Sequence, residues 1–89
     1  MAWRIDYTES ARRTLHKLDP QTAYRILDFM DERVPVQEDP RNTGRALTGP
    51  MRDAFWRYRV GDDHLICDLQ DGVRRVLVVE IGHRNDVYR

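Results

Sequence analysis

The sequence has 89 residues, with fifteen Lys and Arg against fifteen Asp and Glu, so its formal net charge is zero. A chain of this length forms one domain with a modest core. A zero net charge argues against a general nucleic-acid binder, whose affinity for phosphate comes from excess cations. The N-terminal MAWRIDYTES lacks the apolar run of a signal peptide, and no stretch approaches the ~20 apolar residues of a membrane span. We therefore expect one cytoplasmic domain over 1–89 with no role at a membrane.

The first predicted element is a short strand in the segment WRIDY, residues 3–7. Apolar and polar side chains alternate there, which is the period of a half-buried strand. Thr8 then suits the N-cap of a helix, because its hydroxyl can accept a hydrogen bond from a free backbone amide of the first turn. The apolar face of this helix comprises Ala11, Leu15 and Leu18.

A second helix is predicted in the segment LDPQTAYRILDFMDERVP. Asp19 is its expected N-cap, Pro20 suits the first helical position, and Pro35 ends the helix because proline lacks a backbone N–H. The apolar stripe of this helix comprises Ala23, Ile26, Leu27, Met30 and Val34. The two helices together predict a helical hairpin.

Residues 35–53 contain three prolines and two glycines and predict a long connecting loop. The apolar period then changes to two in AFWRYRV, HLICDLQ and VRRVLVVEI, which predict three strands. Gly61–Asp63 joins the first pair, and Asp71–Gly72, a typical hairpin dipeptide, joins the second. The expected fold is α+β with the order β-α-α-β-β-β: a small, mostly antiparallel sheet covered on one face by the helical hairpin.

Alternation within the strands sorts their side chains between the two faces of this sheet. In the segment AFWRYRV we expect Trp56, Tyr58 and Val60 to point under the helices. Phe55, Arg57 and Arg59 then point to the opposite, open face. By the same alternation His64 leaves the core set of its strand. His83, Arg84 and Tyr88 follow or end the last strand and are expected near the same open face.

Charge is segregated along the chain although the total is zero. Between residues 28 and 39 there are five acids and one arginine, whereas residues 41–59 carry five arginines and one aspartate. The five arginines are Arg41, Arg45, Arg52, Arg57 and Arg59. Arginine is planar, permanently charged and suited to bidentate contact with phosphate. A polyanion-binding surface and an ordinary solvated face remain equally open from this pattern alone.

Three segments carry a family resemblance: YTESARRTLHKLDP, LTGPMRDAFWRYRVGDDHLI and VVEIGHRNDVYR. In these segments the chain resembles a RelE-type toxin of the RelE/ParE superfamily of bacterial toxin-antitoxin modules. The resemblance implies a ribosome-dependent endoribonuclease that cuts messenger RNA in the decoding site and is held inactive by a cognate antitoxin. ParE relatives share the fold and instead poison DNA gyrase, which is the main alternative. An inactive relative that only binds its antitoxin is a third interpretation.

The resemblance also implies site residues. Arg57 and Arg59 occupy basic positions of a strand, Arg84 matches the arginine of the segment GHR, and Tyr88 matches a tyrosine near the C-terminus. His64 stands where many relatives carry arginine, since this chain reads GDDHL. The implied catalytic set is therefore Arg57, Arg84 and Tyr88, with His64 and His83 as further candidates.

The chemistry expected of these residues follows from their side chains. Cleavage by the 2′-hydroxyl of RNA needs a base, an acid and cations that stabilise the transition state. Arginine supplies only the cations, because its pKa stays above ~12. Proton transfer must then fall to His64, His83, Tyr88 or a nearby carboxylate.

The remaining expectations concern RNA contacts, metals and the cysteine. Phe55 can stack on an unpaired base, and Arg45, Arg52 and Arg59 are expected to contact RNA. The histidines and the cysteine show no metal-ligand spacing, so we expect neither a metal nor another cofactor. The single cysteine, Cys67, has apolar neighbours and is expected to be a reduced, buried thiol.

Overall fold

The computed structural model describes residues 3–47 and 55–83. Its helices are α1 (Glu9–Lys17) and α2 (Pro20–Asp28), and α2 continues into a π-helical turn, Phe29–Arg33. Its strands are β1 (Arg4–Tyr7), β2 (Arg45–Ala46), β3 (Phe55–Val60), β4 (Asp63–Gln70) and β5 (Arg75–His83). Short 3-10 turns lie at Pro40–Asn42 and Asp71–Val73. The α+β architecture expected from the sequence is confirmed.

Both helices begin at the predicted caps. The Thr8 hydroxyl accepts a hydrogen bond of 3.1 Å from the backbone amide of Ala11. The Asp19 carboxylate accepts one of 3.2 Å from the amide of Thr22, and Pro20 takes the first helical position. Each bond satisfies a backbone donor that the first turn of a helix leaves without an intrahelical partner. Local sequence alone therefore determines where these helices start.

The sheet has five strands in the order β1-β5-β4-β3-β2, one more than predicted. β1 runs parallel to β5, and the other neighbours are antiparallel. The additional strand is β2, which lies within the segment expected to be a loop and pairs Arg45 with Arg57 and Ala46 with Trp56. A two-residue strand shows no periodicity, so its sequence carries no strand signal.

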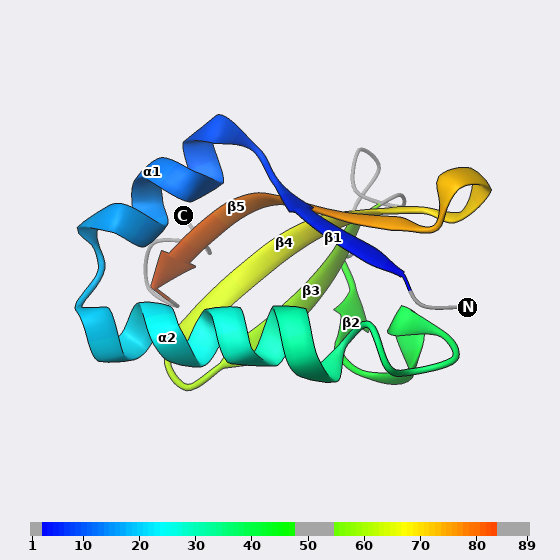
Figure 1. Cartoon of the computed structure of the whole chain (residues 1–89), viewed down its shortest axis with the longest axis horizontal. Helices are drawn as coiled ribbons and strands as arrows, with labels where there is room; N and C mark the ends of the chain where they lie inside the picture. The colour runs from blue at the N-terminus through cyan, green and yellow to red at the C-terminus, as the bar shows by residue number, and fades with distance from the viewer. Residues whose placement is uncertain (1–2, 48–54, 84–89) are drawn as a thin grey trace.

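The two helices cover one face of the sheet (Figure 1), and the core lies between these two layers. Buried side chains from both helical segments and from β3, β4 and β5 form it: Ala11, Ile26, Met30, Val34, Tyr58, Leu65, Cys67, Leu69, Val76, Val78 and Ile81, with Trp3 at its edge. Trp56 and Val60 pack against this cluster, as alternation predicted. The Tyr58 ring meets Phe29 edge to face at a centroid distance of 5.7 Å. Cys67 is a free, buried thiol whose pKa is raised by burial.

The connection between β4 and β5 differs from the expected two-residue turn. Asp71–Val73 forms a 3-10 turn, Arg74 takes the left-handed conformation at φ 51°, and β5 begins only at Arg75. A type I′ turn needs positive φ at both central residues, and Gly72 has none. The Asp71 carboxylate instead accepts two hydrogen bonds, of 3.0 and 2.8 Å, from the Arg41 guanidinium. The turn is therefore longer than the two-residue turn predicted from Asp71–Gly72, and its first residue is held by an ion pair with Arg41.

Candidate active face of the sheet

The open face is the side of the sheet opposite the helices. Cross-strand pairing places residues of neighbouring strands in rows on this face, because directly opposed side chains point the same way. The central row runs from Arg45 on β2 through Arg57 on β3 and Ile66 on β4 to Glu80 on β5. Two arginines are thus adjacent at one end of this row, and a carboxylate stands at the other.

Two further rows flank the central one. Arg59 pairs with His64, which pairs with Gly82. Arg59 is exposed, and its Nε donates a hydrogen bond of 3.1 Å to the Gly61 carbonyl. Phe55 begins the other row and is half-buried. The structure therefore brings Phe55, Arg57 and Arg59 to one face and adds Arg45 through β2.

His64 was expected to leave the core set of its strand, and the structure buries it. Its backbone register places it on the row of Arg59, as alternation predicted, but the residue is only 4% exposed. β4 is an inner strand of the sheet, so His64 has β3 on one side, where it pairs with Arg59, and β5 on the other, where it pairs with Gly82. Alternation identifies the face of a strand residue and does not determine how deeply its neighbours bury it.

Glu80 is the residue of this face that sequence reasoning missed. Simple alternation from Val76 and Val78 would turn Glu80 toward the core. The register shifts instead, because Cys67 pairs with Val78 while Ile66 pairs with Glu80, which leaves Val79 as an extra residue in a β-bulge. A sequence signal existed: regular alternation from Val76 and Val78 would place a charged glutamate at an inward position, which indicates an irregular strand.

Several predicted site residues fall outside the described parts of the chain. Arg52, Arg84 and Tyr88 belong to segments 48–54 and 84–89, so their predicted roles stay predictions. The His83 backbone is described as the last residue of β5, paired with Asp63. Its register is that of Val60 and Asp63, not that of Arg59 and His64.

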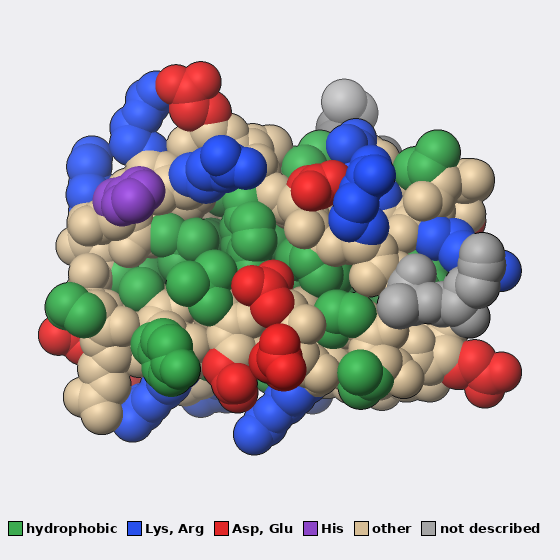
Figure 2. Space-filling view, viewed as in Figure 1, with side chains coloured by type: hydrophobic (Ala, Val, Ile, Leu, Met, Phe, Trp, Pro, Cys, Tyr) green, Lys and Arg blue, Asp and Glu red, His purple; other side chains and the backbone are tan. Residues whose placement is uncertain are grey.

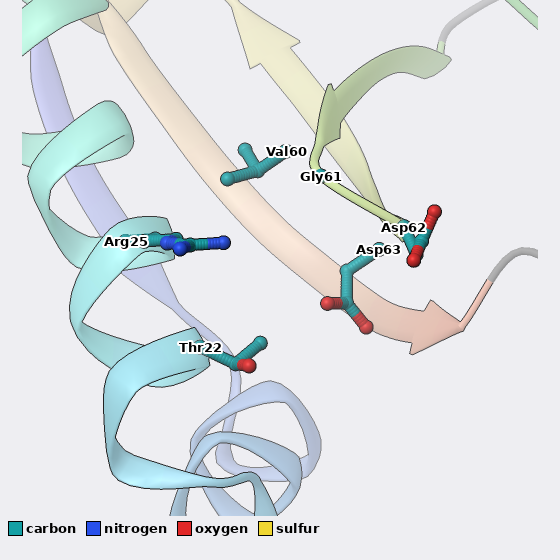
Figure 3. A pocket seen from close by; sticks show the side chains of 6 residues that line it. All are labelled: Thr22, Arg25, Val60, Gly61, Asp62 and Asp63. Atoms are coloured by element: carbon teal, nitrogen blue, oxygen red, sulfur yellow. The ribbon is translucent and has the colours of Figure 1, made fainter.

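The helical side of the sheet carries a hollow of about 260 Å³ beside the β3–β4 turn. Its lining residues are Thr22, Arg25, Val60, Gly61, Asp62 and Asp63. Figure 3 shows the Arg25 side chain reaching toward the hollow from α2, with the Asp63 carboxylate on the strand side. The lining of this hollow carries both positive and negative side chains, whereas the β2–β3 part of the open face carries arginines.

A third surface lies on the helical side. Figure 2 shows apolar side chains gathered in the space between the two helices, with acidic side chains bordering them. A shallow groove of about 360 Å³ along α2 is lined by Tyr24, Leu27, Asp28, Asp31 and Glu32. The Tyr7 hydroxyl donates a hydrogen bond of 3.2 Å to Asp31 Oδ1. Burial, followed by the charge of Asp31, raises the pKa of Tyr7. We refer to the groove lined by Tyr24, Leu27, Asp28, Asp31 and Glu32 as the helical groove.

No helix in the described part of the chain is both long and apolar enough to cross a membrane. Among residues 3–47 and 55–83, no group of three or more His, Cys, Asp and Glu is arranged to hold a metal ion. Among the described residues, the polar and aromatic side chains of the open face include arginines, the Phe55 ring, a buried histidine and the carboxylates of Asp6, Asp68 and Glu80.

The structure thus combines a five-stranded sheet, a helical hairpin on one face and arginines on the other. The family described as the ParE toxin of the type II toxin-antitoxin system, parDE, matches residues 5–88. The chain belongs to this family, within the RelE/ParE superfamily of type II toxins. It is also 28% identical to Toxin RelG of Mycobacterium tuberculosis over 89 residues, which cover 100% of this chain and 99% of the relative.

Solved structures agree on the fold. The toxin-antitoxin complex RelBE2 of Mycobacterium tuberculosis matches with a TM-score of 0.83 at 24% identity, covering 94% of this chain and 93% of that one. The archaeal RelE-RelB complex of Pyrococcus horikoshii has a TM-score of 0.69 at 21% identity, with coverages of 94% and 97%. Isolated E. coli RelE has a TM-score of 0.71 at 19% identity, with coverages of 98% and 92%. The expected RelE/ParE-like fold is thus confirmed.

Proposed function

We propose that this toxin is a metal-independent endoribonuclease that cuts messenger RNA in the decoding site of the ribosome and thereby stops translation. The observation that carries the proposal is the cluster of Arg45, Arg57 and Arg59 on the open face, with Phe55 beside them. Arginines side by side on one sheet face offer planar, permanently charged groups that can contact a phosphodiester backbone lying across the sheet.

Each of these residues has a distinct role in the proposed reaction. Arg57, at the centre of the cluster, stabilises negative charge on the phosphate in the transition state. Arg45 and Arg59 hold neighbouring phosphates, and Phe55 offers a ring on which an unpaired base can stack. His64 has little surface available to a substrate at 4% exposure. Tyr88 and Arg84, which match the family pattern, remain proposed members of the site.

The proposed partner is a cognate antitoxin, and the helical groove suits it. Solved relatives include complexes of RelE with RelB. In this chain the groove combines the apolar surfaces of Tyr24 and Leu27 with the acids Asp28, Asp31 and Glu32. A basic, amphipathic segment complements that surface in both shape and charge. We propose that such a segment of the antitoxin occupies the groove.

The experiment that tests the proposed function is primer extension on a messenger RNA that is translated in the presence of the purified protein. Cuts are expected within codons of translating ribosomes and not in the same RNA without ribosomes. Arg57→Ala should lower the cleavage rate about 10²- to 10³-fold, which corresponds to losing about 2.7–4 kcal/mol of transition-state stabilisation. Arg12→Ala, an exposed arginine on α1, is the matched control and should cut normally.

The alternative function is tested in parallel. A ParE-like toxin would leave messenger RNA intact and would inhibit supercoiling of plasmid DNA by purified gyrase. Inhibition of supercoiling together with uncut RNA contradicts the nuclease proposal. A protein that affects neither process, yet binds the antitoxin encoded beside it, would be the inactive relative.

A further inference from the structure

We propose that Glu80 is a catalytic residue of the nuclease: the general base that takes the proton from the attacking 2′-hydroxyl of the RNA. This inference rests on the proposed function. Arginine cannot accept that proton, so the open face needs another group. Glu80 is an exposed carboxylate on the central row of that face, together with Arg57.

The β-bulge at Val79 is what places Glu80 on the open face. Without the extra residue, Glu80 would take the inward position that Ile81 fills at 5% exposure. Thr8, the cap of α1, holds both carbonyls of the bulge: its amide donates to the Val78 carbonyl at 3.0 Å and its hydroxyl to the Val79 carbonyl at 3.3 Å. Bulges often redirect a side chain next to an active site.

The distance between Glu80 and Arg57 suits a substrate lying between them. Their strands are separated by β4, so their backbones stand about 10 Å apart, which is twice the spacing of neighbouring strands. Only Ile66 lies between them in the row. Both side chains are long and polar. From backbones this far apart, Glu80 can reach the ribose of a nucleotide that lies between them, and Arg57 can reach its phosphate.

Glu80 also differs from the other carboxylates of this face. Asp68 accepts a hydrogen bond of 2.9 Å from Gln70, whose own oxygen accepts one of 2.8 Å from Arg75. Asp6 forms ion pairs with Arg4 at 3.1 Å and Arg75 at 3.6 Å. Within residues 3–47 and 55–83, the Glu80 carboxylate makes no hydrogen bond or ion pair. Its oxygens are therefore available to a substrate.

The proposed step balances without a metal or a redox partner. Glu80 takes the proton of the 2′-hydroxyl, and the 2′-oxygen attacks the adjacent phosphorus while Arg57 stabilises the added negative charge. The bond from phosphorus to the 5′-oxygen breaks, and that oxygen takes a proton from water. The products are a 2′,3′-cyclic phosphate and a 5′-hydroxyl end.

The test compares Glu80→Gln with the wild-type chain on ribosomes that carry a defined messenger RNA. Gln keeps the size of Glu but cannot accept the proton, so the single-turnover cleavage rate should fall about 10²- to 10⁴-fold. Affinity for the ribosome and for the antitoxin should not change. The matched control is Glu38→Gln, an exposed carboxylate in the segment before β2, which should cut at the wild-type rate.

A modified RNA distinguishes a base from an acid. A sulfur atom in place of the bridging 5′-oxygen makes a leaving group that needs no proton. Glu80→Gln should remain slow on this RNA, because the 2′-hydroxyl still requires a base. Full recovery of the rate would make Glu80 the acid and overturn the assignment, as would a Glu80→Gln rate within about threefold of wild type. If the wild-type chain cuts no RNA at all, the proposed function and this inference fail together.

Discussion

The indole Nε1 of Trp56 donates a hydrogen bond of 2.6 Å to the backbone carbonyl of Thr43. The next inward residue of β3, Tyr58, donates from its hydroxyl to the Pro40 carbonyl at 2.6 Å. Two aromatic side chains of β3 thus hold the segment that leads into β2. This attachment brings Arg45 beside Arg57 and completes the arginine cluster of the open face.

Gly44 is the position where this attachment leaves no room for a side chain. It has φ +87°, and a Cβ there would overlap the Arg57 carbonyl oxygen and lie 2.6 Å from Trp56 Nε1. Gly44→Ala should lower the free energy of unfolding by about 2–4 kcal/mol. Gly61→Ala is the control, because Gly61 also has a positive φ, +62°, but no atom lies within 4 Å of the added Cβ. The free energy of unfolding should fall by only about 1–2 kcal/mol in this variant. Equal losses in urea denaturation would contradict the close packing at Gly44.

Thr8 is expected to contribute more to stability than an ordinary helix threonine. Its hydroxyl caps α1 and also reaches the bulge carbonyl of Val79. Thr8→Ala should cost about 1–2 kcal/mol of unfolding free energy. Thr14→Ala is the matched control, because the Thr14 hydroxyl only bonds back to the Ser10 carbonyl within α1 and alanine favours helix. Thermal denaturation should show a lower Tm for the first variant and an equal or higher Tm for the second.

The Arg41–Asp71 ion pair predicts a pH-dependent contribution to stability. The hydrogen bond from Arg41 is the main cause that lowers the pKa of Asp71 in the folded chain. A carboxyl with a lowered folded pKa stabilises the fold above its unfolded pKa of about 3.9 and loses that contribution as pH falls through the folded value. Both side chains are more than a third exposed, so screening by solvent keeps the pair near 0.5–1 kcal/mol.

Urea denaturation between pH 7 and pH 3 measures this contribution. Asp71→Asn should be less stable than the wild type at pH 7, and the difference should shrink as the pH falls below about 4. Asp62→Asn, in the β3–β4 turn, is the control and should show no such convergence. If the stability difference between Asp71→Asn and the wild type stays constant from pH 7 to pH 3, the Arg41–Asp71 ion pair does not cause that difference.

If the antitoxin occupies the helical groove, the side chain of Tyr24 should contribute to the affinity of the complex. This tyrosine is 75% exposed at the rim of the groove. Tyr24→Ala should weaken the complex about tenfold, because exposed aromatic residues often dominate binding surfaces. Val73→Ala is the control: Val73 is 65% exposed in the β4–β5 turn, away from the groove. Isothermal titration with the purified antitoxin measures both, and equal affinities would place the partner elsewhere.

The β3 part of the open face was predictable from the sequence. Alternation in β3 was enough to place Phe55, Arg57 and Arg59 opposite the inward Tyr58, because side-chain direction in a strand depends only on the period of two. The predicted roles of Arg52, Arg84 and Tyr88 concern segments outside the described residues and remain predictions. Residue patterns alone predicted the α+β order of the elements, and the family resemblance contributed the toxin class.

The sequence by itself determined the elements whose causes are local: two helices with their Thr8 and Asp19 caps, the alternating faces of β3, and the buried thiol of Cys67. Only the tertiary structure decided what depends on distant residues. β2 exists because it pairs with β3. The burial of His64 and the outward position of Glu80 depend on neighbouring strands and on a bulge bonded to Thr8. Pairing energy between strands comes from residues far apart along the chain, so no local pattern can encode it.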